Sequence, residues 1–169
     1  MLRPVAVTAV ALSLLAACAT GERLSAAGDV HALLISIRDD DQVAFDAHVD
    51  RPALEAQIQA RLVERAQGAG LGPGATGLGL LLSGPLSRAA GRLFIQPEVF
   101  RAVADYYGYR PATPIPGTFA IASALRPLPD GRVCAVTRSR GPCLVTFAEE
   151  DGVWRLVSFD GDSAMLRLR

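Results

Sequence analysis

Arg132-Val133-Cys134-Ala135-Val136-Thr137 stands between two turns, Pro-Asp-Gly at 129–131 and Ser-Arg-Gly-Pro at 139–142. A short run of apolar and β-branched residues bounded by glycine and proline is typical of a β-strand. Two further runs of this kind follow at residues 143–147 and 153–159, with an Asp-Gly turn between them. Because short turns join neighbouring antiparallel strands, the sequence predicts a C-terminal β-meander.

The meander extends on both sides of these three strands. Upstream, residues 119–125 alternate larger side chains with alanine, and this period of two predicts another strand after the proline-rich linker at 111–116. Downstream, residues 164–168 offer a fifth strand. We therefore expect four to five antiparallel strands over residues 111–169. The hairpin at 151–156 resembles the last hairpin of cystatin-like and nuclear-transport-factor-like folds.

Residues 29–110 have the period of α-helices instead. Apolar side chains at 30–37 follow the i, i+3, i+4 and i+7 spacing of one helix face. Three aspartates at 39–41 are expected to end this helix and to cap a second one, which runs through Phe45 and Val49. The acidic side chains therefore have a structural explanation.

Two more helices are predicted. Asp50 is expected to cap the third, with Pro52 in its first turn and Leu54 and Ile58 on its buried side. The fourth begins near Pro97, which suits the first position of a helix. Helices followed by a meander predict an α+β fold with the helices packed on one face of the sheet.

Two short segments carry a resemblance to a known family. Gly28-Asp29 before the first apolar helix, and Val49-Asp50-Arg51-Pro52-Ala53-Leu54 leading into residues 57–62, resemble a bacterial envelope family catalogued as domain of unknown function 2939. The similarity runs loosely through the C-terminal strands and so covers most of the chain. It implies no catalytic residue, since none is established for that family.

The N-terminus carries Leu15-Ala16-Ala17-Cys18 directly after an apolar run that begins behind Arg3. A positive start, an apolar middle and a small-residue end are typical of a secretory signal, and the run is too short to span a bilayer. The four residues resemble the lipobox of bacterial lipoproteins. This implies that residues 1–17 are removed and that Cys18 becomes the lipidated first residue. The alternative is cleavage by the ordinary signal peptidase at the neighbouring alanines.

A lipobox implies a protein of the cell envelope that is anchored to a membrane on the periplasmic side. Residues 18–28 would then form a short tether that holds the domain close to the bilayer. Ala19 follows the cysteine, and an aspartate at this position would favour retention in the inner membrane. Its absence favours the outer membrane.

Residues 68–95 form a glycine-rich apolar segment between the third and fourth helices. In one interpretation, a glycine loop leads into a helix at 85–94 whose leucines belong to the core. In the other, the segment is a flap over a lipid-binding cavity or lies in the membrane interface, with its arginines facing lipid phosphates. The candidate contacts for an apolar ligand or the membrane are Leu81, Leu82, Arg88, Arg92, Phe94 and Tyr107.

Cys134 and Cys143 lie on neighbouring predicted strands. If their hairpin is centred between Arg138 and Ser139, the two cysteines oppose each other on a sheet face shared with Phe147. Opposed residues are close enough for a disulfide, and an exported protein meets an oxidising compartment. The sequence therefore predicts a disulfide between Cys134 and Cys143. Two buried thiols are the main alternative.

Composition and motifs narrow the functional classes. The chain has 17 basic and 17 acidic residues, and loss of residues 1–17 removes only Arg3, so nucleic acid is not an expected partner. Its two histidines, His31 and His48, belong to no metal or hydrolase motif, and the aspartates at 39–41 lack the spacing of a calcium loop. We expect no catalytic residue, no cofactor and no metal.

Three hypotheses for function follow from these features. The first is a non-enzymatic envelope lipoprotein that binds an apolar small molecule or an envelope protein, with the ligand between sheet and helices and under the segment at 68–95. The second is a structural or assembly lipoprotein with a filled core and no small-molecule ligand. The third is a hydrolase that uses His48 and nearby aspartates.

Overall fold

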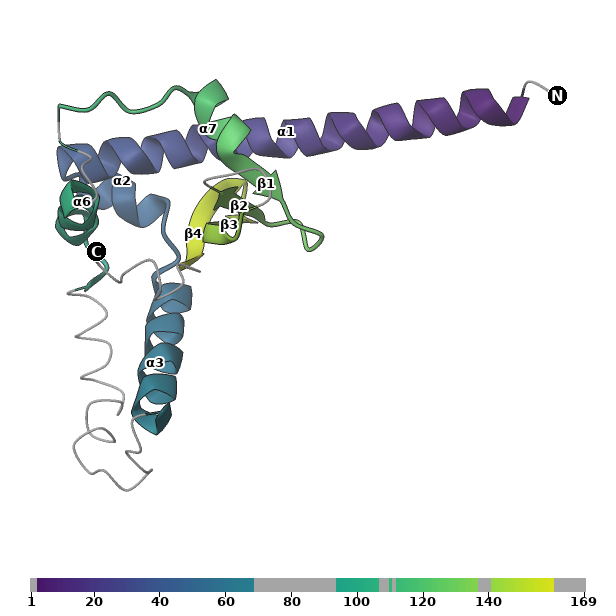
Figure 1. The fold of residues 1–169 in the computed structure, drawn as a ribbon. Helices are drawn as coiled ribbons and strands as arrows, with labels where there is room; N and C mark the ends of the chain where they lie inside the picture. Colours follow the sequence, from purple (N-terminus) through teal and green to yellow (C-terminus); the bar gives the residue numbers. More distant parts are fainter. Residues whose placement is uncertain (1–2, 69–93, 107–109, 111, 137–140, 160–169) are drawn as a thin grey trace.

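The computed structural model describes residues 3–68, 94–106, 110, 112–136 and 141–159 (Figure 1). Helices come first along the chain and the sheet follows. The helices are α1 (Arg3–Asp39), α2 (Gln42–Ala47), α3 (Arg51–Gly68), α6 (Pro97–Tyr106) and α7 (Thr118–Ala124), and the strands are β1 (Leu125–Pro127), β2 (Val133–Val136), β3 (Cys143–Glu150) and β4 (Val153–Phe159).

The four strands form one antiparallel sheet in the order β1-β2-β3-β4. The long helix α1 passes across the sheet and contacts β1, β2 and β4, and α7 packs against α1 (Figure 1). The predicted α+β arrangement, with N-terminal helices packed on a C-terminal meander, is therefore confirmed. The likeness to cystatin-like or nuclear-transport-factor-like folds stays a prediction.

The predicted first helix is part of a longer one, because α1 also includes the residues expected to form the tether at 18–28. Val30 and Leu33 are buried on the predicted apolar face, and Ala26 and Ala27 are completely buried in the same core. The end of the expected tether therefore contributes to packing. Among the residues that the structure describes, no helix has the length and apolar character needed to cross a membrane.

Aspartate caps set the start of the next two helices, as predicted. One carboxylate oxygen of Asp41 accepts hydrogen bonds of 3.0 Å from the backbone N–H groups of Val43 and Ala44. Asp50 accepts a 3.0 Å bond from the N–H of Ala53 in the same way. Such bonds satisfy backbone donors that the first turn of a helix leaves unpaired.

The second helix is shorter than predicted and does not reach Val49. It ends at Ala47 because the chain then pairs with β4: Val49 forms a parallel bridge with Leu156. The N–H of Asp50 donates to the carbonyl of Leu156 at 3.0 Å, and the N–H of Leu156 donates to the carbonyl of His48 at 2.9 Å. This bridge ties the helical half to the last strand.

The strand predicted over residues 119–125 is wrong, because Thr118–Ala124 is helical and β1 begins only at Leu125. Ile121, Ala122 and Leu125 are buried, which is the spacing of a helix face, whereas Phe119 is 80% exposed. The alternating alanines are good helix formers and fit either period. Contacts between α7 and α1 favour the helix.

The disulfide between Cys134 and Cys143 is present, with 5.4 Å between the two Cα atoms. The predicted register is wrong: Cys134 pairs with Thr146, and Cys143 pairs with Val136. Cys143 already pairs two residues away from its predicted partner, and an irregularity between Ala135 and Val136 shifts the pairing by one residue more. A local insertion of this kind leaves no signal in the turn sequence.

The predicted sheet face of the cysteines is also wrong. Phe147 belongs to the core under the helices, and Val145 packs against that core. Because side chains alternate along a strand, Thr146 between them points to the opposite face, and so does its partner Cys134. The disulfide therefore lies on the face away from α1.

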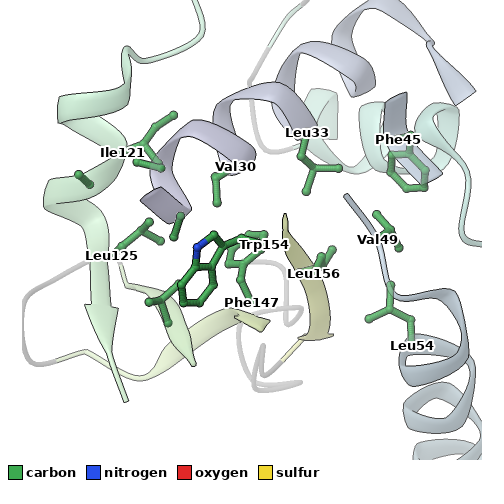
Figure 2. Close-up of a cluster of buried hydrophobic side chains, with 14 of the residues drawn as sticks. Val30, Leu33, Phe45, Val49, Leu54, Ile121, Leu125, Phe147, Trp154 and Leu156 are labelled. Atoms are coloured by element: carbon green, nitrogen blue, oxygen red, sulfur yellow. The ribbon is translucent and has the colours of Figure 1, made fainter. Parts of the chain in front are cut away.

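The core lies between α1 and the inner face of the sheet. Figure 2 shows Trp154 and Phe147 extending from the sheet toward Val30 of α1. The indole Nε1 of Trp154 donates to Ser25 Oγ at 3.2 Å, so this buried aromatic side chain also has its polar atom paired. The helix predicted at 85–94 and the strand at 164–168 lie outside the described residues, apart from residue 94.

Candidate functional site: an apolar pocket beside an arginine-lined groove

A pocket of about 330 Å³ lies between the inner face of the sheet and helices α1, α6 and α7. Every described side chain that lines it is apolar. The pocket therefore offers apolar contacts to a ligand, but the described side chains offer it no hydrogen-bonding groups. Its walls are Val30, Leu33, Leu34, Ile37, Phe100, Pro116, Ala120, Ile121, Ala124, Leu125, Ala135, Val145, Phe147, Leu156 and Phe159.

Small side chains leave this space open. Ala120 and Ala124 of α7 and Ala135 of β2 all line the pocket, and their short side chains fill little of it. As a result, Leu34 and Ile37 on α1 are only partly buried, although they belong to the predicted apolar face of that helix. An apolar ligand that covers these partly buried aliphatic side chains removes their surface from water, and this lowers the free energy of the complex.

Phe159, the last residue of β4, lines the pocket and is held in place by aromatic and polar contacts. The ring of Phe100 lies 5.3 Å from that of Phe159 and 5.2 Å from that of Phe45, measured between centroids. Gln57 of α3 bonds both backbone groups of Phe159 at 2.9 Å, and Arg61 also donates to the Phe159 carbonyl. These contacts position Phe159 as a rigid wall.

A second pocket of about 350 Å³ adjoins the first and shares Leu34, Ile37 and Pro116 with it. It lies at the C-terminal end of α1, between that helix, α6 and the segment that leads to α7. Its charged lining residues are Arg38, Arg101 and Arg110. The other lining residues are Ala104, Thr113, Pro114 and Ile115. We call this second pocket the arginine groove.

Carboxylates outside the arginine groove partly neutralise it. Arg38 donates to Asp39 at 2.6 and 2.8 Å, and this hydrogen bond, more than the charge of the guanidinium itself, holds the pKa of the Asp39 carboxyl below its ordinary value. Arg101 lies 3.7 Å from Asp40. Within the described part of the chain, Arg110 has no such ion pair. Exposed pairs of this kind contribute little stability and exchange readily.

His48 has a carboxylate neighbour that the sequence did not indicate. Its Nδ1 donates to the carbonyl of Ala44 at 2.8 Å, and its Nε2 lies 3.5 Å from Oδ1 of Asp29. The other oxygen of Asp29 accepts the backbone N–H of Trp154 at 2.9 Å. The pair is thus part of the packing between α1, α2 and β4.

Two of the five aspartates that a hydrolase could pair with His48, at positions 46, 50, 105, 160 and 162, are engaged in other contacts, and the last two lie outside the described residues. Asp46 accepts a hydrogen bond of 2.7 Å from Arg51, and Asp50 caps α3. Within the described residues, no group of three or more histidine, cysteine or acidic side chains is placed to hold a metal ion.

Most of the predicted contact residues cannot be placed. Leu81, Leu82, Arg88, Arg92 and Tyr107 lie outside the described residues. Cys18 belongs to α1, but its side chain is also outside them. Phe94 is described: it is 59% exposed and is not part of either pocket.

The walls of the apolar pocket were only partly predictable. The stripe at 30–37 indicated which face of α1 points inward, yet it did not indicate that space remains beside it. That space depends on seven elements, three helices and four strands, that meet in three dimensions. The three arginines come from separate segments, and no spacing in the sequence connects them.

Comparisons with protein-family models, with curated proteins and with solved structures found no match for this chain. The resemblance to domain of unknown function 2939 stays a prediction.

Proposed function

We propose that this protein is a non-enzymatic lipoprotein of the cell envelope that binds an apolar ligand between α1, α7 and the sheet. The observation that carries the proposal is the pocket of about 330 Å³ whose described lining side chains are all apolar. It lies between sheet and helices, where the sequence led us to expect a ligand. The described residues that line it belong to other parts of the chain than the glycine-rich segment.

The size of the pocket suits a small apolar molecule. Ligand pockets usually measure about 300–1,000 Å³, and an apolar cavity of about 150 Å³ already stays dry and takes up benzene. A pocket of about 330 Å³ without polar lining groups holds water poorly, because water needs two to four polar partners. An apolar ligand is the occupant that these walls favour.

Lipidation at Cys18 would place this pocket close to the membrane. Along a continuous α-helix, the twelve residues from Cys18 to Val30 rise about 18 Å. A ligand that leaves the bilayer would therefore have only a short distance to travel. The proposal joins the predicted lipobox and the observed pocket in one function.

Native mass spectrometry of residues 19–169, exported without the lipid anchor, tests the proposal. We expect an added mass that disappears when the same sample is denatured. Ala120 lines the pocket but is exposed at its edge, so Ala120→Phe should fill the space and abolish the added mass. Ala102 is an exposed alanine of α6 outside both pockets, and Ala102→Phe should keep it.

The structural or assembly lipoprotein is the alternative. If repeated preparations from membrane-rich lysates contain no added mass, and added alkyl compounds do not bind, the apolar-ligand proposal is wrong. The pocket would then be a packing defect of a protein that acts through its surface.

A further inference from the structure

We propose that the ligand is a single-chain amphiphile whose alkyl chain occupies the apolar pocket and whose anionic head group lies in the arginine groove. This inference rests on the proposed function and adds the chemical class of the ligand. It is based on the position of the apolar pocket directly beside the arginine groove, because the two pockets have different lining residues. Among the described residues, the side chains that line the apolar pocket are all apolar, and the charged side chains that line the arginine groove are all arginines.

The apolar pocket and the arginine groove adjoin along α1. Leu34 and Ile37, one helical turn apart, line both, and so does Pro116. A chain that extends from Val30 past Ile37 therefore passes from the apolar pocket into the arginine groove. An elongated molecule with one apolar end and one charged end matches this path.

Three arginines favour an anionic head group over a neutral or cationic one. Arginine presents planar donors that suit the oxygens of a carboxylate or phosphate. Arg110 has no ion pair among the described residues, and Arg101 is 3.7 Å from Asp40, longer than a direct charge-assisted hydrogen bond. A bound anion can thus receive bonds from both without breaking a strong existing pair.

The volume argues for one chain rather than two. With roughly 30 Å³ for each group of the size of a water molecule, a pocket of about 330 Å³ takes up on the order of ten such groups. This corresponds to a single alkyl chain of medium length. A twelve-carbon chain is therefore a suitable probe, because its first carbons would lie near the arginine groove.

Calorimetric titration of residues 19–169 with dodecanoate, dodecyl phosphate and dodecanol tests the inference, with each probe below its micellar concentration. The three probes share a chain and differ in head group. Because a charge-assisted hydrogen bond contributes about a factor of ten or more, we expect an anionic probe to bind about ten-fold tighter than dodecanol. The difference should shrink as salt is added, since salt screens exposed charges.

Arginine variants locate the head group. Arg110→Gln and Arg101→Gln should each remove most of the preference for the anionic probe and leave dodecanol binding unchanged, which also shows that the variants fold. Arg65 is an exposed arginine of α3 away from both pockets, so Arg65→Gln is the control of equal charge and should keep the preference.

The outcomes separate the two proposals. If no probe binds, the apolar pocket has no ligand and the proposed function itself fails. If dodecanol binds as tightly as both anionic probes, or if Arg65→Gln lowers the preference as much as Arg110→Gln does, the pocket keeps its function but the anionic head group is wrong.

Discussion

The carboxylate of Asp29 on α1 accepts a 2.9 Å hydrogen bond from the backbone N–H of Trp154 on β4, a residue 125 positions later in the chain. Trp154 is buried, and its indole is bonded to Ser25 of the same helix. Two polar contacts thus fix the position of α1 over the last strand. Since α1 supplies one wall of the pocket, these contacts also maintain the shape of the apolar pocket.

Removing the Asp29 carboxylate should lower the stability of the domain. In Asp29→Ala the Trp154 N–H loses its acceptor, and an unpaired donor of this kind costs about 2 kcal/mol. Asp29→Asn keeps an oxygen that can accept the bond and should cost less than half as much. Urea unfolding followed by Trp154 fluorescence measures both. Equal losses in the two variants would show that this hydrogen bond is not what Asp29 contributes.

The Cys134–Cys143 disulfide should stabilise the fold. It closes a loop of about ten residues, for which the chain-entropy model gives about 2.7 kcal/mol. Arg126 lies over it, with Nη2 at 3.6 and 3.4 Å from the two sulfur atoms. We expect the variant with both cysteines changed to alanine to unfold at a clearly lower urea concentration.

Peptide mapping provides the direct check on that disulfide. Without reduction, digestion of the native protein should yield one peptide pair joined through Cys134 and Cys143. Alkylation of both thiols in unreduced protein would contradict the pairing.

Two substitutions in α7 distinguish the observed helix from the strand that the sequence predicted. In a strand, Phe119 and Ile121 would share one face, whereas in α7 Phe119 is 80% exposed and Ile121 is buried. Ile121→Ala should therefore cost about 2–4 kcal/mol, and Phe119→Ala should stay within about 0.5 kcal/mol. Chemical unfolding of the two variants gives both values. Similar losses would favour the strand.

Lipidation is tested at its one predicted residue. The mature protein expressed in a Gram-negative host should begin at Cys18 and carry the mass of a diacylglyceryl group and an acyl chain. Cys18→Ser should lose this mass and appear in the soluble periplasmic fraction. A mature N-terminus at Ala19 in the unchanged protein would instead indicate cleavage by the ordinary signal peptidase.

Local signals predicted much of the fold. The spacing at 30–37 indicated the inner face of α1, and Asp41 and Asp50 cap helices because their short carboxylates reach nearby N–H groups. The turns at 129–131 and 150–152 correctly divided the meander. In each case the cause lies within a few residues of its effect, so it can be recognised in the sequence.

Tertiary contacts decided the remainder. Residues 119–125 fit a helix and a strand equally well by pattern, and packing against α1 selects the helix. The irregularity after Ala135 moves Cys134 opposite Thr146 and has no marker of its own. The arginine groove brings together Arg38, Arg101 and Arg110 from three segments, so only the folded chain reveals it.

The position of a bound alkyl chain is the most direct test of an apolar ligand site between α1, α7 and the sheet. With ¹³C-labelled dodecanoate and methyl-labelled protein, we predict intermolecular NOEs from the chain to Val30, Leu34 and Val145, which line the apolar pocket. The methyl groups of Val43, 81% exposed on α2, should show none. NOEs confined to exposed methyl groups such as those of Val43, or none in a sample shown to bind, would contradict an apolar ligand site between α1, α7 and the sheet.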